Sequence, residues 1–274
     1  NATDIGELST TQVAALSATQ LARLDTAAAG AFDATQIGAL NATQVRGLTV
    51  TQLAALDAAD IAEFTTTQIA GMTTTQLRAF DATQVAAFAE TQIAALTTTQ
   101  LQAFTTTNLS AFTDTQAAAL TTTQISSLLA SQVAGLAAAD IAEFTNTQLA
   151  ALTTTQVRSL TQTTLGALVD TQIAAFTGTQ LQAISSTALV ALADSQIGAL
   201  TATQVAALNT SQVRAFTAGT IGALTETQVS AFTATQLQAL TSTALGALVD
   251  TQVAALDAAQ VGALRATQIG ALSA

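Results

Sequence analysis

The chain repeats one eight-residue unit without interruption. When each unit is numbered so that Gln is position 4, the consensus is T-x-T-Q-φ-A-A-L, where φ is Ile, Val or Leu, and 34 complete units fill residues 1–272. Gln occupies position 4 in 25 units, and all ten Phe occupy position 8. Such strict register restricts the chain to folds in which every unit has the same kind of neighbours in space.

A longer period lies on top of the octads. Residues 58–64 recur as residues 138–144, and residues 165–172 recur as residues 245–252, both at an offset of 80 residues. This offset indicates growth by duplication of blocks of ten octads. We therefore expect residues 1–274 to form a single uninterrupted solenoid within a longer array, with Ser273 and Ala274 beginning a further unit.

Two alternatives to a solenoid of short helices follow from the same repeat. One continuous helix is disfavoured, because eight residues advance by about 800° and the apolar pair would spiral around the rod. A β-solenoid would place positions 1, 3, 5 and 7 inside and leave the largest side chain, at position 8, outside. The β-solenoid stays open as the alternative fold.

The cap chemistry favours short helices. Position 1 is Ser, Thr, Asp or Asn in 27 of the 34 units, and Gln usually follows three residues later, which is the pattern of the capping box. Positions 5 and 8 share one face of a helical turn, and Ala at positions 6 and 7 is the best helix former. The sequence therefore predicts an all-α solenoid with one short, capped helix per octapeptide.

One octad cannot fold alone, because helix nucleation is costly, so its stability must come from stacking on its neighbours. We expect a continuous core of positions 5 and 8, with the Ala of position 7 packed between them. Glycines at position 6, such as Gly38, Gly166 and Gly246, predict close backbone crossings. The Thr of positions 1 to 3 and the Gln are expected near the corners, either in hydrogen-bonded ladders or on the surface.

Two irregularities carry further predictions. Ala89, Val169 and Val249 are poor caps, and an acid follows each of them; that acid either favours the helix dipole or moves the cap by one residue. Units without Gln place residues 108, 140, 164 and 188 at spacings of 32, 24 and 24 residues. If these units share one face, a superhelical turn holds about 3.3 octads; a structure with two octads per coil would refute this.

Composition excludes most chemistry. The chain has no His, Cys, Lys or Pro, and its six Arg and seventeen acids give a net charge of −11. It therefore lacks an imidazole base, a thiolate and a Schiff-base amine, so we expect no enzyme activity and no cofactor. Clustered cations for nucleic acid are absent, and no apolar run of about 18 residues predicts a membrane span.

The remaining candidate residues all have a simpler explanation. The close acid pairs Asp4/Glu7, Asp60/Glu63 and Asp140/Glu143 could bind a cation or act as acid and base, but we interpret each Asp as a substitute for the capping Gln. Sequons begin at Asn1, Asn41, Asn108 and Asn209, where a cap or the Gln slot accounts for the residue. The arginines are Arg23, Arg46, Arg78, Arg158, Arg214 and Arg265. We interpret them as surface residues and predict no catalytic, cofactor-binding or metal-binding residue.

The octad resembles the T-x-x-Q-φ-x-A-L repeat tracts of very large secreted or surface proteins of bacteria. The residues that carry the resemblance are clearest in Thr65–Met72 (TTTQIAGM) and Thr97–Phe104 (TTTQLQAF), although such tracts often have Pro after the cap and this chain has none. The resemblance implies an extracellular or cell-surface filament, sheath or adhesin stalk that either self-associates into a fibre or continues a longer chain. The alternative is a binding module whose Thr/Gln face recognises ice, carbohydrate or a cell surface.

Overall fold

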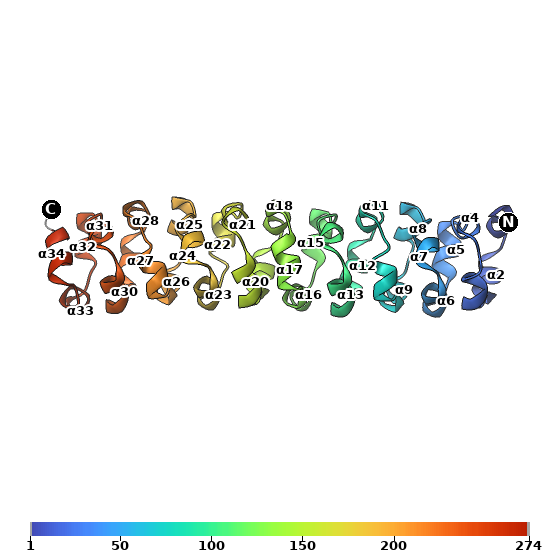
Figure 1. Cartoon of the computed structure of the whole chain (residues 1–274), viewed down its shortest axis with the longest axis horizontal. Coiled ribbons are helices and arrows are strands. Elements are labelled where there is room, and N and C mark those ends of the chain that lie inside the picture. The colour runs from blue at the N-terminus through green and yellow to red at the C-terminus, as the bar shows by residue number, and fades with distance from the viewer. Residues whose placement is uncertain (1, 273–274) are drawn as a thin grey trace. The chain divides into compact units, whose positions relative to one another are not determined.

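Each octapeptide forms one short α-helix. The computed structural model describes residues 2–272, which contain 34 helices of four to seven residues and no strand (Figure 1). Neighbouring turns of the chain pack helix against helix. The predicted all-α solenoid is confirmed, and the β-solenoid alternative is wrong.

The chain divides into two compact units, Asn1–Leu136 and Ala137–Ala274. The helices of the first unit are α1 (Ala2–Gly6), α2 (Thr10–Ala15), α3 (Ala18–Leu21), α4 (Thr26–Ala29), α5 (Ala34–Ala39), α6 (Ala42–Gly47), α7 (Val50–Leu53), α8 (Ala58–Ala62), α9 (Thr66–Gly71), α10 (Thr74–Leu77), α11 (Ala82–Ala86), α12 (Glu90–Ala95), α13 (Thr98–Ala103), α14 (Thr106–Leu109), α15 (Asp114–Ala119), α16 (Thr122–Ser127) and α17 (Ala130–Gly135). The helices of the second unit are α18 (Ala138–Ala142), α19 (Asn146–Ala151), α20 (Thr154–Ser159), α21 (Gln162–Gly166), α22 (Asp170–Ile173), α23 (Gly178–Ala183), α24 (Ser186–Leu189), α25 (Asp194–Gly198), α26 (Ala202–Ala207), α27 (Thr210–Arg214), α28 (Ala218–Gly222), α29 (Glu226–Ser230), α30 (Ala234–Ala239), α31 (Ser242–Leu245), α32 (Asp250–Ala254), α33 (Ala258–Gly262) and α34 (Ala266–Leu272).

The capping box breaks the chain into these helices. At α13, the Thr97 hydroxyl accepts a hydrogen bond from the Gln100 N–H at 3.2 Å, and the Gln100 side-chain oxygen accepts one from the Thr97 N–H at 2.8 Å. Thr97 has extended backbone (φ −68°, ψ 156°), and so does Phe104 at the C-terminal end (φ −62°, ψ 141°). Two extended residues, at positions 8 and 1, therefore form each such corner, as the cap pattern predicts.

Apolar caps keep half of the box. Ala89, Val169 and Val249 are still the N-cap residues of their helices, and they have no side-chain acceptor. The Ala89 N–H still donates to the Gln92 side-chain oxygen at 2.6 Å, and Glu90 is the first residue of α12. The prediction that the acid moves the cap by one residue is therefore wrong, and the acid lies in the first turn, where it favours the helix dipole.

Within each unit, helices pack against the helix three octads further along. In the first unit α3 packs on α6, and α6 packs on α9 (Figure 1). In the second unit α20, α23 and α26 follow the same rule. Side-chain hydrogen bonds join octads that are four apart, such as Gln44 to Val13. A turn of the solenoid thus holds between three and four octads, which agrees with the predicted value of about 3.3 and differs from the two octads that would have refuted it.

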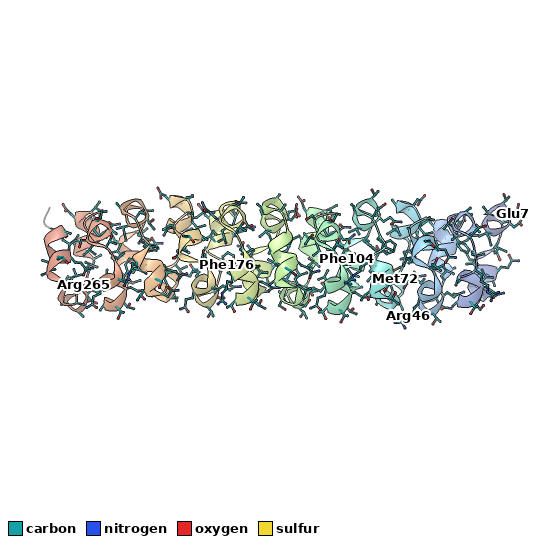
Figure 2. All side chains as sticks on the ribbon, viewed as in Figure 1. Glu7, Arg46, Met72, Phe104, Phe176 and Arg265 are labelled. Carbon is teal, nitrogen blue, oxygen red and sulfur yellow. The ribbon has the colours of Figure 1, made fainter. Side chains whose placement is uncertain are left out.

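The core consists of positions 5 and 8. Leu101 is fully buried, and Phe104 and Phe176 are 3% and 1% exposed within their units (Figure 2). Phenylalanines on successive octads also contact each other edge to face, as Phe80 and Phe88 do at 5.4 Å between ring centroids. Position 7 is mostly half-buried rather than enclosed, so it lies at the rim of the core.

Close backbone approaches involve position 7 more than position 6. A Cβ added to Gly47, at position 7, would lie 2.6 Å from the Ala18 Cβ, and one added to Gly135 would lie 2.5 Å from a Thr106 methyl group. At position 6, an added Cβ would lie 2.8 Å from a backbone oxygen at Gly246 but would meet nothing within 4 Å at Gly166. The prediction from position 6 therefore holds for some units and is wrong for others.

Candidate functional surface

The Gln side chain ties each turn of the solenoid to the preceding one. The Gln44 amide nitrogen donates to the carbonyls of Val13 and Leu16 at 3.2 and 2.7 Å. Those carbonyls belong to positions 5 and 8 of the octad four units earlier, at the C-terminal end of a helix. The Val13 carbonyl also accepts from the Leu16 N–H at 3.1 Å, so the Gln is its second donor. The same pattern recurs in the second unit, where Gln236 donates to Val205 and Leu208 at 3.0 and 2.7 Å.

One amide therefore serves two helix ends. Its oxygen completes the cap of its own helix, and its nitrogen caps the C-terminal end of a helix in the neighbouring turn. Gln44 and Gln236 are each 3% exposed. Gln12 and Gln20 have no octad four units earlier in the sequence, and they bond only within their own caps and are exposed.

This geometry corrects the expected Thr/Gln face. The Gln of position 4 lies inside the solenoid. The expectation that Gln forms a hydrogen-bonded ladder is therefore right, and the expectation that it lies on the surface is wrong. Exposed Thr side chains occur at positions 1, 2 and 3, such as Thr97, Thr122 and Thr99. The position 1 hydroxyl is occupied by its cap, so positions 2 and 3 contribute the hydroxyls that face solvent without a capping task.

A second tie comes from long side chains at position 6. The Gln102 amide donates to the Ser127 carbonyl at 2.6 Å, and the Arg78 Nε donates to the Ala103 carbonyl at 2.9 Å. Both acceptors are 25 residues further along, at position 7 of the octad three units later. Position 6 is variable and its partner is distant in sequence, so the octad consensus gave no signal for this contact. Arg46, at the same position in α6, is exposed at the edge of its unit (Figure 2).

The Asp of an acidic pair takes part in the helix cap in the two pairs whose cap residue is among the described residues. The Asp57 N–H donates to Asp60 at 3.1 Å, and the Ala137 N–H donates to Asp140 at 2.9 Å. Glu63 is exposed. Asp4 lies in the first turn of α1 with Glu7 just after that helix, but the preceding Asn1 is outside the described residues. Between residues 2 and 272 no three His, Cys, Asp or Glu come together as a metal site would require.

Two carboxyl groups have shifted pKa values. Burial raises the pKa of Asp60, which is 6% exposed. The hydrogen bond from the Asp57 N–H partly offsets this increase, and the charges of Asp57 and Asp33 add to it. Asp33 is exposed, and hydrogen bonds from the Thr35 hydroxyl and the Gln36 N–H lower its pKa below the ordinary value. The two shifts have opposite signs because Asp33 accepts several hydrogen bonds at a helix N-terminus, whereas Asp60 is enclosed beside other acids.

The sequon asparagines have structural tasks. Asn41 and Asn209 accept hydrogen bonds from the Gln44 and Gln212 N–H groups, each at 3.0 Å, as N-caps. Asn108 is 5% exposed, and its amide nitrogen donates to the Phe80 carbonyl at 2.9 Å. Asn1 lies outside the described residues.

Surface hollows in the described chain differ in their lining, and Glu90, Arg78 and Glu226 each line one of them. One hollow of about 440 Å³ beside Thr106 and Gly135 is lined by Ala, Thr, Ser and Gly only. No helix within residues 2–272 has both the length and the apolar character needed to cross a bilayer.

Comparison with known families agrees with the octad. The sequence model of the ALTTAQ repeat matches residues 53–90, 61–98, 93–130 and 205–242. All four matches begin at position 5 of an octad, so they share the register of the capped helices. A comparison with curated proteins gave no match. These parts of the chain therefore match the ALTTAQ repeat, and the octapeptide resemblance is confirmed.

Proposed function

We propose that this ALTTAQ repeat chain is a structural spacer of an extracellular or cell-surface bacterial protein, built as a stalk, sheath or filament of stacked octapeptide helices. One observation carries the proposal: the amide at position 4 is used internally in octad after octad. A binding protein would present such an amide to a ligand. In this chain the amide instead joins one turn of the solenoid to another.

Local contacts support a spacer. An octad packs on the octad three units away and is tied to the octad four units away. Added octads would bring the same set of contacts, so the reach of such an array grows with the number of repeats while its local stability is preserved. The 80-residue duplications are consistent with selection on length.

The composition supports a location outside the cell. The chain has no Lys and only six Arg, so proteases that cleave after basic residues have few sites, which suits durable extracellular material. It also has no His or Cys, and the proposal assigns it no catalytic task and no cofactor.

The proposed partner is a further stretch of the same octapeptide solenoid. Within each unit, a helix packs on the helix three octads away, and further octads of the same chain, or a second copy that self-associates into a fibre, would stack by the same kind of contact. Contacts of this kind, which repeat without closing, produce filaments.

The test is a length series. Chains with the block 58–137 present once, twice or three times are compared by small-angle X-ray scattering and negative-stain microscopy, and intact producing cells are labelled with an antibody against the tract. A spacer predicts equal increments in maximum dimension and labelling of unpermeabilised cells. Constant dimensions, or labelling only after permeabilisation, would overturn the proposal.

A second candidate is recognition by the exposed Thr hydroxyls. The observation that favours it is the exposed position 3 hydroxyl, as at Thr99, Thr107 and Thr123. Ice and carbohydrate are the ligands whose hydroxyl lattices such a surface would match. Thermal hysteresis and glycan binding should both fall when these three residues are changed to Ala, and their absence in the unchanged protein at high concentration removes this candidate.

A further inference from the structure

Asp60 occupies a position that elsewhere donates a hydrogen bond. It is residue 4 of its octad, and the octad four units earlier ends at Phe32. In regular units a Gln nitrogen bonds the position 8 carbonyl of that earlier octad, as Gln52 bonds Leu24 at 2.7 Å. An ionised carboxylate has no proton to donate there.

Asn108 in the same unit shows where the Asp60 oxygens lie, because Asn and Asp have the same shape. The Asn108 oxygen accepts from the Thr105 N–H at 3.1 Å, and its nitrogen donates to the Phe80 carbonyl, 28 residues earlier, at 2.9 Å. Asp60 repeats the first contact, because its Oδ2 accepts from the Asp57 N–H at 3.1 Å.

By this correspondence, the second oxygen of Asp60 takes the place of the Asn108 nitrogen, whose equivalent acceptor is the Phe32 carbonyl, again 28 residues earlier. Two acceptor oxygens attract each other at such a position only when one of them carries a proton.

We propose that Asp60 is a proton-dependent tie between two turns of the solenoid: when protonated, its hydroxyl donates to the Phe32 carbonyl, and when ionised it repels that carbonyl and loosens the contact. The step is a simple acid dissociation, in which the proton leaves to solvent. This inference is independent of the proposed function.

The surroundings favour the protonated form. Asp60 is 6% exposed, and the charged groups that face it are acids: Asp57 at the start of its own helix and Asp33 at the N-cap of α5, which packs against α8. The helix α11, which also packs against α8, begins after the N-cap Asp81. Burial and these neighbouring acids raise the pKa of Asp60.

The sign of the pH effect follows from that increase. Because the folded pKa lies above the unfolded value, the Asp60 contribution to stability is fully present below the unfolded pKa and is lost as the pH rises through the folded pKa. The tie is therefore closed below the folded pKa of Asp60 and open above it.

The test compares thermal unfolding of the full chain and its variants between pH 4 and pH 8. Asp60→Asn supplies the missing donor, so its melting temperature should exceed that of the unchanged chain at pH 8, and the excess should vanish towards pH 4. Asn108→Asp creates a second acid tie, so it should melt lower at pH 8 and recover in acid. Glu63→Gln, which removes one exposed charge from the same octad, is the matched control and should show neither trend.

A direct readout keeps the proposal falsifiable if a variant folds poorly. The carboxyl carbon of Asp60 in the unchanged chain, followed by NMR, should titrate with a midpoint above the ordinary Asp value of about 3.9. A midpoint at or below that value, or an Asp60→Asn difference that stays constant with pH, overturns the proposal.

Discussion

At the scale of the residue, the amide of Gln does two jobs that no other common side chain of its length combines. Its oxygen accepts the N–H of the N-cap residue of one helix, and its nitrogen donates to carbonyls at the C-terminal end of another. Glu can supply only the acceptor, and Met supplies neither. This pairing explains why a buried polar residue recurs in the core of a chain that is otherwise apolar at positions 5 and 8.

Replacement of a buried Gln should therefore cost more than replacement of an exposed one. Gln100 bonds the Thr97 N–H and the Met72 carbonyl, each at 2.8 Å. Gln100→Met keeps the side-chain volume but leaves both groups unpaired. We expect a loss of about 2–4 kcal/mol in the free energy of unfolding. Gln12→Met is the control, because the exposed Gln12 makes the cap bond alone, and it should cost less than about 1 kcal/mol. Equal losses in urea unfolding would contradict the double role.

A cap missing from the sequence can be restored. Ala89 has the extended backbone of an N-cap (φ −69°, ψ 153°) but no side-chain acceptor. Ala89→Ser supplies one, and we expect a gain of about 1 kcal/mol. Ala94→Ser, at an exposed site inside the same helix, is the control and should cost about 0.5 kcal/mol. Thermal unfolding measures both, and a gain in the control alone would show that capping does not limit this helix.

Asp33 gives a pH dependence opposite to that of Asp60. Its pKa is lowered by the Thr35 hydroxyl and the Gln36 N–H, so its contribution to stability is present above the unfolded pKa and is lost as the pH falls through the folded pKa. Asp33→Asn retains an N-cap acceptor and should make unfolding less sensitive to acid. An NMR titration of Asp33 with a midpoint at or above the ordinary value would refute the shift.

At the scale of the element, each helix is too short to persist alone. It is held by its cap, by its two core residues and by the helix three octads away. The close approach between position 7 of one helix and position 2 of the octad three units earlier limits the side chains that fit there. Gly47 against Ala18 is one such contact.

Two glycines test this packing with opposite expected signs. Gly47→Ala would place a Cβ 2.6 Å from the Ala18 Cβ and 3.0 Å from the Ala18 carbonyl oxygen, so we expect a loss of about 1–3 kcal/mol. Gly166→Ala meets nothing within 4 Å in a helix, so it should gain about 0.5–1 kcal/mol. Calorimetric unfolding distinguishes the two, and a gain from Gly47→Ala would mean that the helices do not approach this closely.

The helices could be predicted from sequence because their causes are local. A Thr with a Gln three residues later and an apolar pair three residues apart, as in Thr97 to Phe104, determine one cap and one buried face. The Gln100 bond to Met72 could not be predicted, because it joins residues 28 apart and depends on the number of octads in a turn. For the same reason, the sequence alone could not decide whether Gln lies in a hydrogen-bonded ladder or on the surface. It also predicted a close backbone approach at Gly166 rather than at Gly47.

At the scale of the whole molecule, the octad is the unit of sequence, of helix and of contact. The ties of three and four octads recur in each compact unit, and the ALTTAQ matches fall in the same register in both units, at residues 93–130 and 205–242. A structure made by repeating one set of local contacts accounts for a chain that uses few residue types and reserves its amides for internal bonds.

The most direct test of this account is the backbone chemical shifts of the full chain in solution. They should indicate a helix over four to seven residues in every octad, interrupted at each corner by residues of extended geometry, such as Leu40 (ψ 139°) and Asn41 (ψ 164°). Uninterrupted helical shifts across such corners, or extended shifts throughout, would contradict the capped octad as the unit of the fold.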